Sequence, residues 1–168
     1  DLGSPVLSEL QKTMLQATRE VEVKFDEQEI LENAMRRTGL SNFGPDDFRE
    51  RLHVWCQSLR EDHAANPMGK MGVYNDTLRY AINRLRLEDL VARHPEILDV
   101  EIQKPLIIVG LPRSGTTHLL NLISADQRLR SLPYWESVEP IPVPGEGPGA
   151  DGRDPRYVRC RQNFEQTD

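Results

Sequence analysis

The stretch KPLIIVGLPRSGTTHLLNLI, residues 104–123, constrains the fold of this chain more than any other segment. It begins with the apolar run Leu106 to Val109, which is typical of a strand buried on both faces of a parallel sheet. A turn with two glycines follows, and from Thr116 to Ser124 the apolar residues take helical spacing. Strand, glycine-rich turn and helix in this order make a phosphate-binding βα unit. We therefore predict an α/β fold with a parallel sheet flanked by helices, including a second short strand over residues 129–132.

The residue types in the turn predict a binding site for an anion. Gly110 and Gly115 let the backbone turn tightly and approach a ligand closely. The backbone N–H groups of residues 114–117 lie at the start of the helix, where they lack intrahelical acceptors and meet the positive end of the helix dipole. Arg113 adds a permanent charge whose planar guanidinium suits phosphate oxygens. Thr116 stands where an ATP- or GTP-binding loop has lysine, so the pattern argues against a nucleoside triphosphate.

The residues ahead of the turn predict a mostly helical region, because apolar residues recur there at steps of three and four. We expect a first helix capped by Ser4 and Pro5 and extending to Val21, a second from Asp26 to a stop at Gly39, a third from Pro45 to Asn66-Pro67, and a fourth capped by Asn75 or Asp76 and extending to Arg93. Beyond Pro140, proline and glycine predict an irregular loop before another helix. The chain thus divides into a helical N-terminal region, 1–103, and the start of an α/β domain, 104–168.

Composition excludes several classes of partner and setting. The formal net charge is −6, whereas binding to nucleic acid needs a concentrated basic face, so we expect no nucleic-acid partner. No apolar stretch approaches the roughly 18 residues that a membrane span needs. Cys56 and Cys160 form neither a metal-ligand pair nor a disulfide framework, and we find no secretory signal in the sequence. These features favour a reducing, cytoplasmic location.

The segment GLPRSGTTHLL, after an apolar run and before a helix, resembles the 5′-phosphosulfate-binding loop of the sulfotransferases that use 3′-phosphoadenosine 5′-phosphosulfate (PAPS). The arginine at position 113 is similar to that of the tyrosylprotein and bacterial branches, and the helical stretch ahead of the loop resembles a group of bacterial sulfotransferases. The resemblance implies a P-loop fold related to the nucleotide kinases and transfer of a sulfuryl group from PAPS to a hydroxyl or amine. The acceptor would be a small molecule, a lipid or a glycan. The resemblance also implies that Arg113 contacts the 5′-phosphate and the bridging oxygen, while Ser114, Gly115, Thr116 and Thr117 hold the phosphosulfate.

Two further expectations concern the donor site. A sulfuryl group carries less charge than a terminal phosphoryl group, so we expect no requirement for a metal ion. Members of the resembled family bind the 3′-phosphate of the donor through an arginine and a serine well downstream of the loop, and no later segment here resembles that element. We therefore expect the chain to be the N-terminal portion of a sulfotransferase, with an incomplete α/β domain and no activity alone. The sequence indicates no oligomeric state.

Three residues compete for the role of the base that removes the acceptor's proton. Glu136, in LPYWESVEP, follows the predicted second strand, and the rings of Tyr134 and Trp135 would raise its pKa by partial desolvation. Its position resembles that of the catalytic glutamate in the tyrosylprotein branch, but the local spacing differs by a few residues, so Glu139 is an alternative. His118 lies in the first turn of the loop helix. We choose Glu136 as the hypothesis.

Two other classes of protein stay open. One is another P-loop nucleotide-dependent transferase or kinase in which the lysine has been replaced. The other is a non-catalytic, truncated interaction protein whose helical half binds a partner. Affinity for the desulfated product nucleotide, compared with affinity for ATP, separates these classes.

Overall fold

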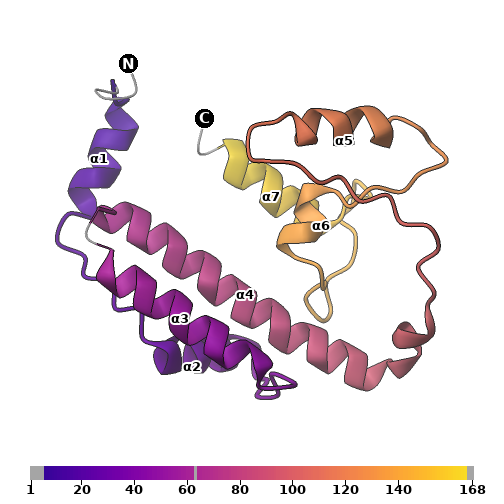
Figure 1. Cartoon of the computed structure of the whole chain (residues 1–168), viewed down its shortest axis with the longest axis horizontal. Coiled ribbons are helices and arrows are strands. Elements are labelled where there is room, and N and C mark those ends of the chain that lie inside the picture. Colours follow the sequence, from indigo (N-terminus) through magenta and orange to yellow (C-terminus); the bar gives the residue numbers. More distant parts are fainter. Residues whose placement is uncertain (1–5, 63, 166–168) are drawn as a thin grey trace. The chain divides into compact units, whose positions relative to one another are not determined.

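The computed structural model describes residues 6–62 and 64–165 (Figure 1). The chain divides into two compact units, and the boundary along the sequence lies between His94 and Pro95. The first unit contains α1 (Glu9–Ala17), α2 (Glu27–Thr38), α3 (Asp47–Glu61) and α4 (Pro67–Arg93). The second contains the 3₁₀-helix η1 (Pro95–Asp99), then α5 (Thr116–Ser124), α6 (Tyr134–Val138) and α7 (Pro155–Glu165). None of the helices formed by the described residues is long and apolar enough to cross a membrane.

The start and stop of α2 follow from its local sequence, as predicted. The carboxylate of Asp26 accepts a hydrogen bond from the backbone N–H of Glu29 at 2.8 Å, which satisfies one of the free donors at the helix start. Gly39 ends the helix in the left-handed conformation, with φ of 70°, which costs glycine little because it has no Cβ.

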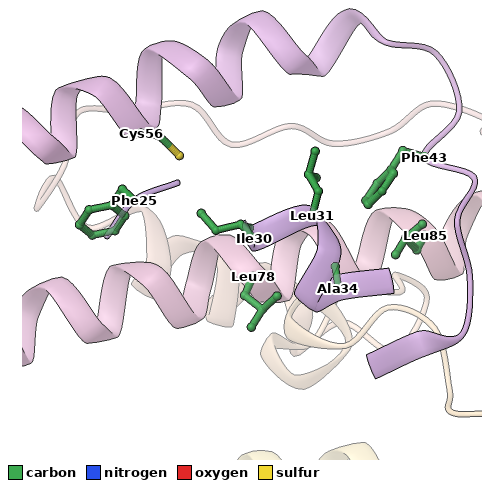
Figure 2. Close-up of a cluster of buried hydrophobic side chains, with 8 residues drawn as sticks. All are labelled: Phe25, Ile30, Leu31, Ala34, Phe43, Cys56, Leu78 and Leu85. Atoms are coloured by element: carbon green, nitrogen blue, oxygen red, sulfur yellow. The ribbon is translucent and has the colours of Figure 1, made fainter. Parts of the chain in front are cut away.

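The core of the first unit forms where α2 packs against α4 and α3. Figure 2 shows the buried side chains of α2 between those contributed by α3 and α4. The cluster consists of Phe25, Ile30, Leu31, Ala34, Phe43, Cys56, Leu78 and Leu85. Every fully buried hydrophobic residue among those described belongs to this cluster, so the second unit has no comparable core.

The predicted boundaries of the first, third and fourth helices are wrong. Ser4 and Pro5 lie outside the described residues, and α1 instead begins after Ser8, whose side chain forms a reciprocal capping box with Gln11. The longest helix, α4, begins at Pro67 and not near Asp76. The side-chain oxygen of Asn66 accepts from the N–H of Gly69 at 2.8 Å, and proline is well tolerated at the first helical position. The pair Asn66-Pro67 therefore begins α4 and does not end the third helix, because α3 already ends at Glu61.

The predicted parallel sheet is also wrong. None of the described residues forms a β-strand, either over residues 104–109 or over 129–132. Leu106, Ile107 and Val109 are 69%, 78% and 87% exposed, so the apolar run is not buried in this chain. The physical reason is that a strand needs a neighbouring strand to accept and donate its backbone hydrogen bonds, and no described segment pairs with this one. The P-loop kinase-like α/β fold class is corrected to a helical one.

The second unit is organised around α6 and α7. The rings of Tyr134 and Phe164 lie 5.5 Å apart, and those of Trp135 and Tyr157 lie 6.5 Å apart in an edge-on arrangement. Between the two helices, residues 140–154 form the irregular proline- and glycine-rich segment that was predicted, and α7 follows it.

Candidate functional site

The glycine-rich turn leads directly into α5, which begins at Thr116 and ends at Ser124 as predicted. Gly115 precedes the helix in the left-handed conformation, with φ of 88°. The N–H of Leu119 donates to the carbonyl of Gly115 at 3.0 Å, which is the first hydrogen bond of the helical ladder. The N–H groups of Thr116, Thr117 and His118 come before it and therefore have no acceptor within the helix. They form the donor end of a helix, where an anion is favoured.

The turn itself closes tightly on Gly110. Ser114 donates twice to the carbonyl oxygen of Leu111, from its backbone N–H at 3.2 Å and from its hydroxyl at 2.6 Å. This closure brings the later half of the turn over Gly110. A Cβ atom at Gly110 would lie 2.8 Å from the Oγ of Ser114 and 2.8 Å from the Cγ2 of Thr116, closer than real Cβ contacts. A side chain at Gly110 would therefore force this packing to shift. Residues 110–118 form one compact turn, which we call the anion-binding turn after its predicted function.

Arg113 adopts a backbone conformation that is unusual for an arginine. Its φ is 65°, in the left-handed region that non-glycine residues seldom occupy. Its side chain is exposed, and no hydrogen bond or ion pair joins its guanidinium to any described residue. Strain of this kind concentrates at functional sites. A strained backbone and an unengaged cation within one anion-binding turn agree with the predicted role of Arg113, which stays a prediction.

The two candidate glutamates have different ionic partners. Glu136, in α6, accepts from Arg130 through its Oε2 at 2.7 Å, and its side chain is only 19% exposed. Both carboxylate oxygens of Glu139 accept from Arg159, at 3.1 and 2.6 Å. Because Arg130 contacts only one oxygen of Glu136, the Oε1 of Glu136 can accept a hydrogen bond from another donor. Arg159, in contrast, holds both oxygens of Glu139.

Arg159 also binds Glu146 from the irregular segment, at 2.9 and 3.0 Å, so one guanidinium joins α7, the end of α6 and the loop. The hydrogen bonds that Arg159 donates to Glu139, and then those to Glu146, raise the pKa of Arg159. The contacts give Glu139 a structural function in this unit.

A second arginine of this unit is largely buried. The side chain of Arg156 is only 11% exposed, although no sequence prediction singles it out. It donates to the carbonyls of Glu139 and Pro140 at 3.0 and 3.1 Å, and its guanidinium lies 4.8 Å from the ring centre of Trp135. Hydrogen bonding to Arg156 lowers the pKa of Asp154, which stabilises the pair. The sequence feature that points to these two residues is the spacing of Arg156 and Arg159, three residues apart, which places both on one face of α7.

The structure therefore assembles only part of the predicted site. It brings Arg113, Ser114, Gly115, Thr116 and Thr117 into one turn, with His118 exposed in the first turn of the helix. Among the described residues, no hydrogen bond or ion pair joins Glu136 or Glu139 to this turn. No group of three or more potential metal ligands occurs in residues 6–62 and 64–165, and independence from metal stays a prediction.

Comparisons with known proteins identify the class to which this arrangement is related. Residues 105–167, which contain the anion-binding turn and both glutamates, match the model of the sulfotransferase family. A search among curated proteins gave no significant match. The family model thus confirms the predicted resemblance to sulfotransferases over these residues, and the use of PAPS stays a prediction.

Two solved structures are similar to the chain over most of its length. Sulfotransferase STF9 from Mycobacterium avium is 29% identical, with a TM-score of 0.72 over 88% of this chain and 37% of its own. Sulfotransferase STF1 from Mycobacterium tuberculosis is 27% identical, with a TM-score of 0.70 over 89% of this chain and 40% of its own. The chain is similar to bacterial sulfotransferases and spans about two fifths of the length of these two.

Proposed function

We propose that the protein takes part in sulfuryl transfer from PAPS to the hydroxyl or amine of a small-molecule, lipid or glycan acceptor. The observation that supports this most strongly is the anion-binding turn at residues 110–118, which lies within the segment that matches the sulfotransferase family. Two free cysteines, Cys56 and Cys160, support the cytoplasmic setting that we propose with it.

The residues present fit the 5′-phosphosulfate end of the donor. The N–H groups at the start of α5 and the hydroxyl groups of Thr116 and Thr117 are donors for its oxygens. At Gly110 the absence of a side chain lets Ser114 and Thr116 pack closely over the backbone, which keeps the turn closed. Arg113 supplies a planar cation without a competing internal ion pair among the described residues.

These groups would act on the charge that transfer creates. As the acceptor oxygen bonds to sulfur, the bond from sulfur to the bridging oxygen breaks, and negative charge grows on the departing 5′-phosphate. Preorganised N–H donors and the Arg113 guanidinium would stabilise that charge more strongly in the transition state than in the ground state. The proton of the acceptor hydroxyl would pass to a carboxylate of the chain.

Glu136 is the carboxylate that we propose for this proton. Glu139 is the weaker alternative, since Arg159 occupies both of its oxygens, while Arg130 contacts only one oxygen of Glu136. In the full-length protein with its acceptor, we expect Glu136→Gln to lose turnover with unchanged nucleotide affinity, and His118→Ala to keep most of it. The reverse result, in which only the histidine variant loses turnover, would assign the base to His118.

The donor is tested by nucleotide binding. We expect adenosine 3′,5′-bisphosphate, the product left after transfer, to shift the backbone amide signals of residues 113–118 in ¹H–¹⁵N spectra at lower concentration than ATP. Preference for ATP would instead indicate a kinase-like transferase. Binding of neither nucleotide would indicate an interaction protein, and both results would reject the proposal.

A further inference from the structure

The first unit contains an apolar groove that the anion-binding turn does not use. It has a volume of about 530 Å³ and lies between α3 and α4, with α2 contributing to its floor. Leu52 and Ala81 line it, the rings of Trp55 and Tyr80 flank it, and Arg51 and Arg84 add charge. All of these residues belong to the first unit, so the groove shares no residue with the proposed donor site.

Two polar contacts between α3 and α4 mark the ends of the groove. At one end, the indole N–H of Trp55 donates to the hydroxyl of Thr77 at 3.0 Å. At the other, Arg84 donates to Asp47 at 3.3 Å. Asp47 and Trp55 are separated by about 12 Å along α3, at about 1.5 Å per residue.

Trp55 is held in place yet exposed. Thr77 is buried, and its hydroxyl donates to the carbonyl of Val73 at 2.8 Å, which fixes the acceptor that orients the Trp55 indole. Trp55 nevertheless remains 48% exposed, and Tyr80 is 62% exposed. Rigid aromatic surface of this kind gives contact area to a ligand at little cost in conformational entropy.

The groove also has an excess of positive charge. Asp47 contacts Arg51 through one oxygen and Arg84 through the other, so one carboxylate serves two guanidinium groups. Arg84 also donates hydrogen bonds to the carbonyl oxygens of Phe43 and Pro45. Arg51 is exposed and contacts Asp47 through a single nitrogen. Its other N–H groups can therefore donate to a second anion.

We infer that this groove binds a flat apolar molecule with one anionic group, such as an aryl carboxylate or an aryl sulfate. The rings of the ligand lie against Trp55 and Tyr80, over the apolar floor, and its anionic group contacts Arg51. Ring contact supplies most of the affinity, and Arg51 selects the charged ligand over a neutral one of the same shape.

The test uses the indole N–H signals of the chain, which has two tryptophans. Trp135→Phe assigns the remaining signal to Trp55. We expect 2-naphthoate to shift the Trp55 signal saturably while the Trp135 signal of the unmodified chain stays unchanged. The neutral isostere 2-naphthamide should bind about threefold more weakly, the scale of an exposed charge contact. A titration with 2-naphthyl sulfate then shows whether carboxylates or sulfates are preferred.

Three variants distinguish the proposal from nonspecific binding. Arg51→Gln should abolish the preference for naphthoate over naphthamide. Arg93→Gln, which removes another i,i+4 ion pair of the same unit outside the groove, should keep it. Tyr80→Ala should weaken binding of both ligands by about two- to tenfold, from the loss of ring contact.

Several results would overturn the inference. Equal shifts at both tryptophans, equal affinity for the charged and neutral ligands, or retained preference in Arg51→Gln would each reject it. A shift of the Trp55 signal with protein concentration, in the absence of ligand, would show that a second copy of the chain occupies the groove, and would also reject it.

Discussion

Replacing Gly110 by alanine tests whether the close approach within the anion-binding turn is needed for binding. The added Cβ would lie 2.8 Å from both the Oγ of Ser114 and the Cγ2 of Thr116. Gly110 does not have a positive φ, so alanine can adopt its backbone conformation and the effect is a steric one. Both crowded atoms belong to residues of the turn, so relief of the contact must move the turn or rotate Ser114.

The expected magnitude follows from the cost of overpacking. Forcing an extra methyl group into filled space costs about 1–3 kcal/mol. Rotation of Ser114 would relieve part of the contact, but it would break the 2.6 Å hydrogen bond to Leu111, worth about 0.5–1.5 kcal/mol. If the turn opens instead, the fraction of molecules competent to bind falls by a factor that corresponds to at most this free energy. Affinity for the nucleotide should therefore fall by up to about 150-fold.

The assay is titration of the chain with adenosine 3′,5′-bisphosphate, followed by ¹H–¹⁵N spectra, which detect weak binding. Gly147→Ala is the matched control, because a Cβ there meets nothing within 4 Å and its φ is not positive. Its affinity should equal that of the unmodified chain. Far-ultraviolet circular dichroism should be the same for both variants. Unchanged affinity in Gly110→Ala would refute the idea that the closed turn is the conformation that binds.

Three further predictions concern the turn and the core. In the full-length protein, Arg113→Ala should lower turnover by about 100- to 1,000-fold, the effect of removing one preorganised donor, and near-normal turnover would reject its role. Leu85 is completely buried, so Leu85→Ala should lower the free energy of unfolding in urea by about 2–5 kcal/mol, and a loss below about 1 kcal/mol would contradict the assigned core. Burial, and then the charge of Glu27, raises the pKa of Cys56 from 9.0 to about 11. Between these two pH values the thiol is protonated in the native state but deprotonated in the unfolded chain. Its contribution to stability is complete below pH 9 and is lost as the pH rises to about 11. Cys56→Ala, though less stable overall, should therefore lose less stability than the unmodified chain over that interval, and an equal or steeper loss would contradict the shift.

The parts of the fold that the sequence predicted are those decided by neighbouring residues. Asp26 and Gly39 set the ends of α2 through a side-chain cap and a left-handed residue, both local features. The same holds for α5, whose start at Thr116 follows from the left-handed Gly115. Asn66-Pro67 shows the limit of local patterns, because the pair is compatible with the end of one helix and the start of the next.

The parts that failed depend on residues far apart in the chain. The run Leu106 to Val109 indicated a need for burial, but a strand also requires a partner, and local pattern contains no information about one. The spacing of Arg156 and Arg159 places both on one face of α7, but for a similar reason it does not predict which residues they contact. They join α7 to Glu139 and Glu146 across the irregular segment, and many exposed arginines would have the same sequence surroundings.

The distribution of buried residues leads to a last prediction, about the stability of the binding turn. The fully buried hydrophobic cluster of the described residues lies in the first unit, whereas the turn is closed by local hydrogen bonds between Ser114 and Leu111. Local bonds without a core open at low free energy, so the amides of α5 should exchange with deuterium much faster than those of α2 and α4. Adenosine 3′,5′-bisphosphate, which would bind only the closed turn, should slow exchange in residues 110–119 and leave α2 and α4 unchanged. Protection of α5 equal to that of α2 before the nucleotide is added, or slowing spread evenly over both units, would show that the turn is not the independent binding element that its contacts indicate.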